Sequence, residues 1–545
     1  MARRININVL ECFTGLGFDD HRSCASSTAS SGTPYSFLRP TARDKFSAES
    51  LSLSRCARLI VYCYKKSEDV SCALWRNLIE LSHLFNPFQI DTLTSKPSAI
   101  LRLRRLLGLD RAVVLTVLAR GWSSLAGLVT IVLIAHTLTG AEQGYYYTFG
   151  SLVALQIVFE LGFSFVILQM ASHECAHLSI SKNDEIIGDP VAHARLASVL
   201  QKSVRWYSIT ALLMPCILIP AGLHFFASNS HSGHEVAWRL PWWLVVLVAS
   251  FAFQIDPVFS FLEGCGYVPQ VARTRLWQAL LGSVLAWAAM LTHHGLFAPA
   301  MTIAGQVLAG SAWLYTRRRL LFPLFIYNPG QDRIHWWQEV WPFQWRIAIS
   351  WICGYFIFQL FNPILFAFRG PIAAGQMGMS LNISNALLAV SIAWVNTKAA
   401  PFGAMIARKE YAKLDHIFFR TLTQSLVVCV LGSVAVWSGV VYLNLAQSRF
   451  AHRVLGPLPF GMLLLAMIFN HIVTSEAIYL RGHKQEKFLL NSVLGALFML
   501  FSSYVLGRMF GAIGMVSGYL GGTTVIGLGF GTFTFLKYRR IWHAE

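Results

Sequence analysis

Apolar residues occur in long runs along this chain, and polar residues gather between the runs. A run of about 20 apolar residues is long enough to cross the hydrocarbon core of a bilayer as a helix. Twelve such runs are bounded by charges or by Pro, Gly and His clusters, at residues 112–136, 145–171, 206–227, 241–264, 276–292, 296–316, 342–368, 371–396, 421–443, 456–480, 488–507 and 511–536. The pattern predicts an all-α polytopic membrane protein.

The composition supports this prediction. Of the 545 residues, 55% are hydrophobic and 13% are charged, whereas a soluble protein carries about 25% charged residues. A net charge of +18 is also typical of proteins that bind nucleic acid. Such a protein, however, gathers its basic residues into a patch on a soluble domain. Here they separate apolar runs, so we expect contact with membrane lipids and no nucleic-acid partner.

The distribution of positive charge predicts the orientation in the membrane. Cytoplasmic loops retain Lys and Arg. Loops after the even-numbered runs, together with the C-terminal tail, hold most of the Lys and Arg outside the runs. The basic segment from Arg102 to Arg111 lies on the same side. Both termini are therefore predicted to be cytoplasmic.

Residues 1–101 do not share the pattern. They have no sustained helical or strand period, a Ser- and Thr-rich stretch at residues 23–36, and no signal-peptide pattern. Half of the ten cysteines lie here without paired metal-ligand spacing: Cys12, Cys24, Cys56, Cys63 and Cys72. We expect a poorly ordered N-terminal extension. One hypothesis is a mis-assigned start, with the functional chain beginning near Arg102.

The rest of the chain reads as two similar halves. A first span containing Arg120 is followed by a turn at residues 139–145, and a seventh span containing Arg346 is followed by a turn at residues 369–378. Internal repeats in transporters place the substrate site between them, near the bilayer midplane. We expect two six-helix bundles around a central cavity, at residues 102–320 and 321–545.

Five ionisable residues fall inside the apolar runs: Arg120, Glu160, Asp256, Arg346 and Glu476. A charge in hydrocarbon costs roughly 2.5 to 3.5 kcal/mol even on the lenient insertion scale, so such residues normally face a cavity lined by protein. The pattern therefore indicates a transporter rather than an enzyme.

Short motifs add a family resemblance. They are Arg120-Gly121-Trp122, the turn with Gly140, Glu142, Gly144 and Tyr146, the run Phe159 to Phe163 followed by Gln169 and by Ala171 to Glu174, and the basic segment Pro401 to Arg420. Over about residues 102–540, and most strongly over 112–180, the chain resembles O-antigen and capsular polysaccharide flippases. These are Wzx-type members of the multidrug/oligosaccharidyl-lipid/polysaccharide (MOP) exporter superfamily.

The resemblance implies a V-shaped pair of six-helix bundles in the bacterial inner membrane. It implies movement of an undecaprenyl-diphosphate-linked oligosaccharide to the periplasmic leaflet, for biosynthesis of a surface polysaccharide such as the O-antigen of lipopolysaccharide. The partners expected are this lipid-linked oligosaccharide, a polysaccharide polymerase and a chain-length regulator.

Candidate substrate-binding residues follow from the anionic diphosphate. Arg120 and Ser124 share one small, polar face of the first span, and Arg346 lies on the matching face of the seventh with Ser350 and Gly354. An arginine can donate two parallel hydrogen bonds to phosphate. The alternative is that each arginine extends to the membrane interface. Amides that can bind sugar hydroxyls or neighbouring helices continue this lining: Gln359, Asn362, Asn382, Asn385 and Asn396.

Candidate ion-coupling residues are Glu160, Asp256 and Glu476. Glu160 shares a face with Ser164, and Asp256 shares one with Glu263. A desolvated carboxyl group can exchange protons near neutral pH and so couple transport to a proton gradient. The alternative is a structural ion pair, for example between Glu160 and Arg120.

Two other functions were weighed. His173, Glu174 and His177 match H-E-x-x-H, which would suit an integral-membrane zinc protease. No persuasive third ligand follows, so no metal and no cofactor are expected. The second alternative is a multidrug cation antiporter of the same superfamily. The binding site of such a protein is expected to be lined by carboxylates that attract the cationic ligand. Here the first helix of each half carries an arginine, which favours an anionic cargo.

Overall fold

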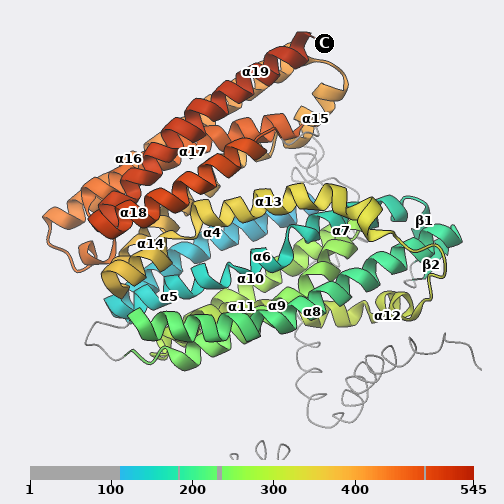
Figure 1. The fold of residues 1–545 in the computed structure, drawn as a ribbon, viewed down its shortest axis with the longest axis horizontal. Coiled ribbons are helices and arrows are strands. Elements are labelled where there is room, and N and C mark those ends of the chain that lie inside the picture. The colour runs from blue at the N-terminus through green and yellow to red at the C-terminus, as the bar shows by residue number, and fades with distance from the viewer. Residues whose placement is uncertain (1–110, 182–184, 230–235, 484–486, 545) are drawn as a thin grey trace, which may run out of the picture. The chain divides into compact units, whose positions relative to one another are not determined.

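The computed structural model describes residues 111–181, 185–229, 236–483 and 487–544. The predicted N-terminal extension lies outside these residues. Every apolar run of the sequence falls on helical segments, and the protein is an all-α polytopic membrane protein (Figure 1).

The first half of the described chain holds α4 to α12. The helices are α4 (Arg111–Thr137), α5 (Gly140–Val153), α6 (Gln156–Glu160), α7 (Phe163–Cys175), α8 (Pro190–Asn229), α9 (Arg239–Gly264), α10 (Val268–Leu291), η1 (Gly295–Phe297), α11 (Ala298–Thr316) and α12 (Arg318–Ile326). Between α7 and α8 the strands β1 (Leu178–Ile180) and β2 (Ile186–Gly188) form an antiparallel hairpin, with Leu178 opposite Gly188.

The second half runs from η2 to α19. Its helices are η2 (Trp336–Val340), α13 (Trp341–Phe358), α14 (Phe361–Asn396), α15 (Ala399–Ala407), α16 (Tyr411–Leu445), η3 (Ala451–Arg453), α17 (Pro457–Arg481), α18 (Leu489–Gly522), η4 (Thr523–Phe530) and α19 (Gly531–Ala544). All described helices belong to one unit. The division into two lobes at residue 320 therefore stays a prediction.

Two glycines interrupt the long helices of the second half where the sequence predicts a boundary between spans. Gly370 (φ 83°) divides α14, and Gly511 (φ 63°) divides α18. A positive φ is readily adopted by glycine and ends a run of helix. By length and composition, seven helical stretches among the described residues could cross a membrane, or eight if the bent pair of residues 140–175 is one span.

Two of the seven stretches, Gln344–Gly403 and Leu489–His543, contain 60 and 55 residues and include these breaks. Each is long enough for two crossings of about 20 residues. The count of twelve spans stays a prediction.

Three helices have bounds that differ from those of the predicted apolar runs. Helix α10 begins at Val268 rather than residue 276, and α8 begins at Pro190 rather than residue 206. The predicted run 342–368 is also divided, because α13 ends at Phe358 and Gln359 caps it. An apolar run marks only the part of a helix that lies in hydrocarbon, and the same helix can continue through polar sequence at either end.

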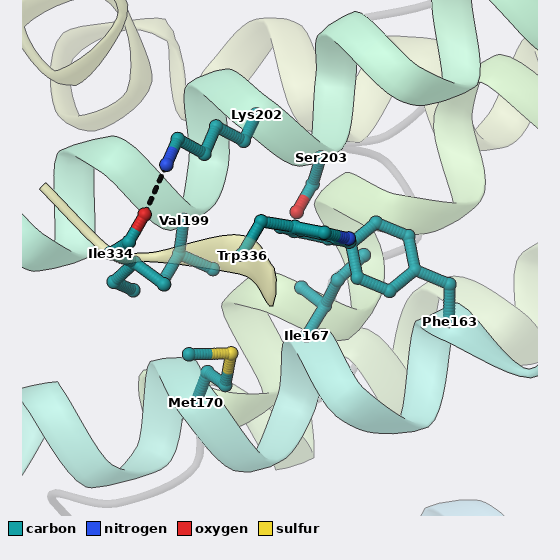
Figure 2. A pocket seen from close by; sticks show the side chains of 8 residues that line it. All are labelled: Phe163, Ile167, Met170, Val199, Lys202, Ser203, Ile334 and Trp336. Carbon is teal, nitrogen blue, oxygen red and sulfur yellow. Dashed lines mark hydrogen bonds between the residues drawn. The ribbon is translucent and has the colours of Figure 1, made fainter. Parts of the chain in front are cut away.

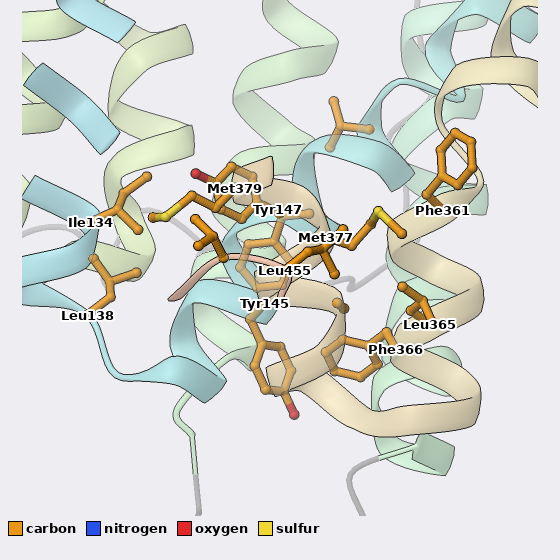
Figure 3. Close-up of a cluster of buried hydrophobic side chains, with 14 of the residues drawn as sticks. Ile134, Leu138, Tyr145, Tyr147, Phe361, Leu365, Phe366, Met377, Met379 and Leu455 are labelled. Atoms are coloured by element: carbon orange, nitrogen blue, oxygen red, sulfur yellow. The ribbon is translucent and has the colours of Figure 1, made fainter. Parts of the chain in front are cut away.

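The two halves meet where α5 crosses α14. A Cβ at Gly144 would lie 1.9 Å from the carbonyl oxygen of Pro371, so the two backbones touch there. The Nε2 of Gln143 donates to the carbonyl oxygens of Gly375 (2.8 Å) and Arg453 (2.9 Å). Buried Tyr145, Tyr147, Phe366, Met377 and other apolar side chains surround this contact (Figure 3).

A capping box formed by Thr139 and Glu142 stabilises the turn before α5. The backbone N–H of Thr139 donates to the Glu142 carboxylate (2.8 Å), and the backbone N–H of Glu142 donates to the Thr139 hydroxyl (3.2 Å). Such reciprocal bonds satisfy helix N–H groups that have no other partner. The motif around Gly140 therefore has a structural explanation: Glu142 starts the helix and Gly144 allows the close crossing.

A second core packs α7, α8 and the segment before η2. Figure 2 shows a gap lined there by Phe163, Ile167, Trp336 and neighbouring side chains, with the Lys202 ammonium donating to the carbonyl oxygen of Ile334. The gap measures about 10 Å³, which is room for about one water molecule. It is a packing gap and too small for a ligand.

Candidate functional site

The second predicted span bends sharply inside the first half. Helix α6 ends at Glu160, Leu161 (φ 53°) and Gly162 (φ 67°) are both left-handed, and the helices on either side form an angle of 44°. A left-handed leucine costs about 1 to 2 kcal/mol, so the surrounding packing must hold it. A Cβ at Gly162 would lie 2.5 Å from Ile347 of α13, which shows how closely α13 packs on the bend.

Glu160 lies at this bend with hydroxyl partners. The Ser164 hydroxyl donates to the Glu160 carboxylate (2.7 Å), and its oxygen lies 2.9 Å from the hydroxyl of buried Tyr207. The Tyr207 ring in turn lies 4.7 Å from the ring of Phe253 on α9, one turn before Asp256, so the two candidate coupling residues of this half lie in one region. The alternative ion pair with Arg120 is not tested, because the Arg120 side chain lies outside the described structure.

Asp256 and Glu263 share a cation that the sequence interpretation missed. Arg275 Nη1 lies 3.8 Å from an Asp256 oxygen, and its Nε lies 4.0 Å from a Glu263 oxygen. The guanidinium also stands over the ring of Phe259, 5.4 Å from its centroid. We call Glu160, Asp256, Glu263 and Arg275 the charged wall.

Two members of the charged wall are half-exposed, and one of them, Asp256, lies within a helix that is long and apolar enough to cross a membrane. The side chains of Asp256 and Arg275 are 50% and 46% exposed. Asp256 precedes the end of α9 by eight residues, or about 12 Å at 1.5 Å per residue. A charged side chain at such depth faces water or protein rather than lipid tails. The wall therefore marks a hydrated surface on α9 and α10.

The predicted substrate residues of the first half lie on α4. Arg120 and Ser124 are helical, and Ser124 is half-buried. The indole N–H of Trp122 donates to Ser283 of α10 (3.1 Å), and that of Trp287 donates to Thr130 (2.9 Å). These two bonds show that α4 and α10 run parallel. Arg120 and Arg275 therefore stand on neighbouring helices, both toward the helix N-terminal ends.

The predicted substrate residues of the second half are spread over α13, the break that follows it and α14. Arg346 is exposed on α13, with its guanidinium 5.4 Å from the ring centroid of Trp345. Gln359 lies at the break after α13, Asn382 is half-buried on α14, and Asn385 is exposed there. Asn362, in contrast, donates to the Ser151 hydroxyl of α5 (3.0 Å), which is the helix-joining role of an intramembrane amide.

A cavity of about 310 Å³ opens between α13, α17, α18 and η4. Ser350 and Gly354, the predicted polar face of α13, line it together with Asn470 and Thr474 of α17. Asn491 also lines it, and its buried Oδ1 has no hydrogen-bond partner among the described residues. The cavity has the size of a small ligand site. One wall is η4, a π-helix, and such segments are frequent at functional sites.

Glu476 belongs to a separate, closed cluster on α17. It is 3% exposed and accepts a hydrogen bond from the Thr532 hydroxyl (3.2 Å). Nearby on the same helix, the fully buried His471 places Nε2 2.9 Å from the Ser425 hydroxyl. The three predicted coupling residues are thus divided: Glu160 and Asp256 lie together, and Glu476 lies apart from them in the other half.

The H-E-x-x-H segment forms an ion-pair network. Glu174 is buried and accepts from Arg195 Nε (2.9 Å), whose Nη2 lies 2.5 Å from Glu339. Helix α7 ends at Cys175, so His177 lies beyond the helix, and the His173 side chain is 78% exposed. In the part of the chain that the structure describes, no three His, Cys, Asp or Glu side chains gather as a metal site.

The same network lowers the pKa of Glu339, a residue outside the membrane-spanning segments. Partial burial alone would raise the pKa of Glu339, but the hydrogen bond from Arg195 and one from the His335 backbone N–H outweigh it and hold that pKa below its ordinary value. The network joins α7, α8 and the start of η2.

Arg275 was missed for a simple reason. The predicted fifth span began at residue 276, which left Arg275 in a loop, whereas α10 begins at Val268. The stripe of Asp256 and Glu263 could have raised the expectation of a cationic partner. Nothing in the local sequence could have given the Glu174–Arg195–Glu339 network, because Glu339 is far away along the chain.

Comparisons with known proteins support the fold. No family model matches the chain, and no curated protein matches it in sequence. Among solved structures, the MATE multidrug transporter DinF-BH is similar over 83% of this chain and 99% of its own, with 12% identity and a TM-score of 0.50.

Two further structures are similar with lower TM-scores. An inward-facing MATE family transporter of the MOP superfamily gives 0.49, at 14% identity over 76% of this chain and 99% of its own. The lipid II flippase MurJ, in an inward closed conformation, gives 0.47, at 12% identity over 79% of this chain and 90% of its own. At 12% identity, the likeness to DinF-BH shows the fold alone and leaves the cargo open.

Proposed function

We propose that this protein is a flippase that carries an undecaprenyl-diphosphate-linked oligosaccharide across the bacterial inner membrane for surface polysaccharide biosynthesis. The observation that carries the proposal is the charged wall, since half-exposed charges inside apolar helices require a hydrated path. The fold shared with a MATE transporter supports a transport function, and the Wzx-type motifs support the cargo.

The arginines provide the attraction for a diphosphate. Arg275 stands on α10, Arg120 on the adjacent α4 and Arg346 on α13. From the Trp122–Ser283 and Trp287–Thr130 contacts, Arg120 and Arg275 differ in height along the paired helices by about 3 to 9 Å at 1.5 Å per residue. Two such residues can flank one diphosphate, and an arginine fork suits phosphate oxygens.

The carboxylates of the charged wall provide a way to release the cargo from Arg275 during transport. Asp256 and Glu263 compete with a cargo phosphate for Arg275, because all three are anionic partners of one guanidinium. Protonation of Asp256 would remove one competitor and favour cargo binding, and loss of that proton would favour cargo release. A proton gradient could therefore bias the direction of transport.

One observation favours a second candidate, a multidrug cation antiporter. The wall holds three carboxyl groups, Glu160, Asp256 and Glu263, against the single guanidinium of Arg275. A surface with that balance attracts cations when all its groups are ionised. The two candidates differ in what Arg275 does: it binds the cargo of a flippase, but only neutralises the site of a cation antiporter.

The test is transport by the purified chain in proteoliposomes, with a fluorescent lipid-diphosphate oligosaccharide in one assay and a dye cation in another. For the flippase we expect movement of the lipid only, and at least a tenfold loss in Arg275→Ala, about 1.4 kcal/mol of lost interaction. Arg273→Ala is the matched control, because Arg273 is an exposed arginine on the same helix. Dye transport that survives Arg275→Ala would support the antiporter instead.

A further inference from the structure

Two cysteines that are distant in sequence meet at one end of the first half. Cys175 is the last residue of α7, and Cys265 directly follows α9. Their Sγ atoms lie 2.9 Å apart, and both residues are partly exposed. A disulfide has an S–S distance of about 2.05 Å, so the two sulfurs need only a small further approach to bond.

Packing of the backbone brings the pair together. A Cβ at Gly264 would lie 2.5 Å from the carbonyl oxygen of Leu168 and 2.8 Å from the Cβ of Ala171, so only a glycine lets the end of α9 press against α7. Cys265 is the next residue after Gly264, and Cys175 follows Ala171 by one helical turn. The proximity of the two cysteines in the fold is thus a consequence of the close helix crossing.

We propose that Cys175 and Cys265 form an oxidant-responsive dithiol that closes to an intramolecular disulfide. With hydrogen peroxide as the oxidant, one thiol loses its proton and its sulfur attacks a peroxide oxygen, the O–O bond breaks, and the leaving hydroxide takes up that proton, which gives a sulfenic acid and one water. The second thiol then attacks that sulfur, the S–S bond forms, the S–O bond breaks, and a second water leaves. Two thiols and one hydrogen peroxide give one disulfide and two waters.

The reverse step is thiol–disulfide exchange with a dithiol reductant, which takes up the oxidising equivalents as its own disulfide. The pair lies on the side that the charge distribution predicts to be cytoplasmic. Reduced thiols persist in that compartment, so the dithiol is the resting form and the disulfide a response to oxidant.

The bond would fix the structure around the charged wall, a consequence that rests on the proposed function. Helix α7 begins at the bend of Leu161 and Gly162 and ends at Cys175. Cys265 lies in the turn that joins α9, with Asp256 and Glu263, to α10, with Arg275. A disulfide would hold α7 to this turn and oppose any rotation of α7 about the bend.

The experiment uses a full-length variant that keeps only Cys175 and Cys265, with buried Cys353 and Cys429 changed to alanine and the other cysteines to serine. Reduced protein should bind two maleimides by intact mass. After hydrogen peroxide it should bind none, and after dithiothreitol two again. A variant that keeps Cys216 and Cys265 is the matched control, because Cys216 is exposed on α8. After hydrogen peroxide, this control should not show the loss of both maleimide-binding thiols that dithiothreitol reverses.

The outcomes separate the thiol chemistry from its consequence. Two maleimides bound after peroxide treatment, or sulfinic acid in place of the disulfide, would overturn the inference whatever the protein transports. With the disulfide formed, flipping in proteoliposomes should fall at least twofold and recover with dithiothreitol. Unchanged flipping by the oxidised protein would overturn the regulatory role, and absence of flipping by the reduced protein would count against the proposed function alone.

Discussion

Two acidic residues in apolar helices, Asp256 in the first half and Glu476 in the second, have opposite surroundings. In the first half, the Asp256 side chain is 50% exposed and pairs with Arg275. In the second half, Glu476 is 3% exposed and accepts a hydrogen bond from the Thr532 hydroxyl. Both lie in strongly apolar helices. An exposed, paired carboxylate points to water at that depth, whereas a buried one points to a role inside the protein.

This difference changes the functional assignment made from sequence. Apolar surroundings made Glu160, Asp256 and Glu476 look equivalent as coupling residues. Tertiary packing puts the first two next to a hydrated surface and the third in a buried site, where it accepts a hydrogen bond from the Thr532 hydroxyl. A proton that drives transport must reach its site from bulk water, so the first half is the better candidate for coupling.

The largest expected effect concerns the arginines of the two halves. Arg120→Ala should reduce export of the lipid-linked glycan at least tenfold, because it removes a cation from the helix beside α10. Arg346→Ala should have a smaller effect, since Arg346 is exposed over Trp345 near the start of α13. Arg120→Lys should keep part of the activity, because the charge remains and the fork does not.

Surface polysaccharide measured at matched membrane expression checks this order. Wild-type levels in the Arg120→Ala strain would remove Arg120 from the mechanism. Equal losses from both alanine variants would remove the proposed asymmetry between the halves.

The next prediction, with an effect of intermediate size, compares how carboxylates of the two halves affect proton coupling. Asp256→Asn and Glu160→Gln should flatten the response of transport to a pH gradient while cargo still binds, because neither amide takes up a proton in this range. Glu476→Gln should keep the response, since its site is closed to water. The measurement is the flipping rate in proteoliposomes with and without an imposed gradient. A gradient response lost only in Glu476→Gln would reverse our assignment.

The contact between the halves can be tested by stability. Gly144→Ala places a Cβ against the Pro371 carbonyl oxygen and should lower the free energy of unfolding by about 1 to 3 kcal/mol or more, the usual cost of overpacking. Gly150→Ala in the same helix is the control, because no atom lies within 4 Å of its added Cβ. Thermal unfolding in detergent compares the two. Equal midpoints would mean that α5 and α14 do not touch as described.

The smallest effect belongs to the Arg195–Glu339 pair outside the membrane. The pKa of Glu339 is lower in the folded protein than its ordinary value of about 4.3. Its contribution to stability is therefore complete above that ordinary value and disappears as the pH falls through the folded value. Since both side chains are about a third exposed, the contribution is below about 1 kcal/mol.

Thermal unfolding followed from about pH 6 to about pH 3 tests this. Wild-type protein should lose slightly more stability than Glu339→Gln over the range. A steeper loss in the glutamine variant would contradict the sign of the pKa shift.

The sequence by itself determined which segments are helical and where several of them break. Every apolar run coincides with helical segments, and Gly370, in a turn predicted between two runs, has the positive φ that glycine tolerates. These features are local, since they depend on residues within a few turns of one another. The sequence also put Asp256 and Glu263 on one face of one helix, which needs only the helical period.

Only the tertiary structure decided which side chains meet. Arg275 became the partner of Asp256 because α10 extends past its apolar run and lies beside α9. Glu174 was committed to Arg195 instead of a metal, and Cys175 met Cys265 because Gly264 permits a close crossing. Such meetings depend on which helix faces pack together, and that choice comes from long-range shape and burial that no local pattern contains.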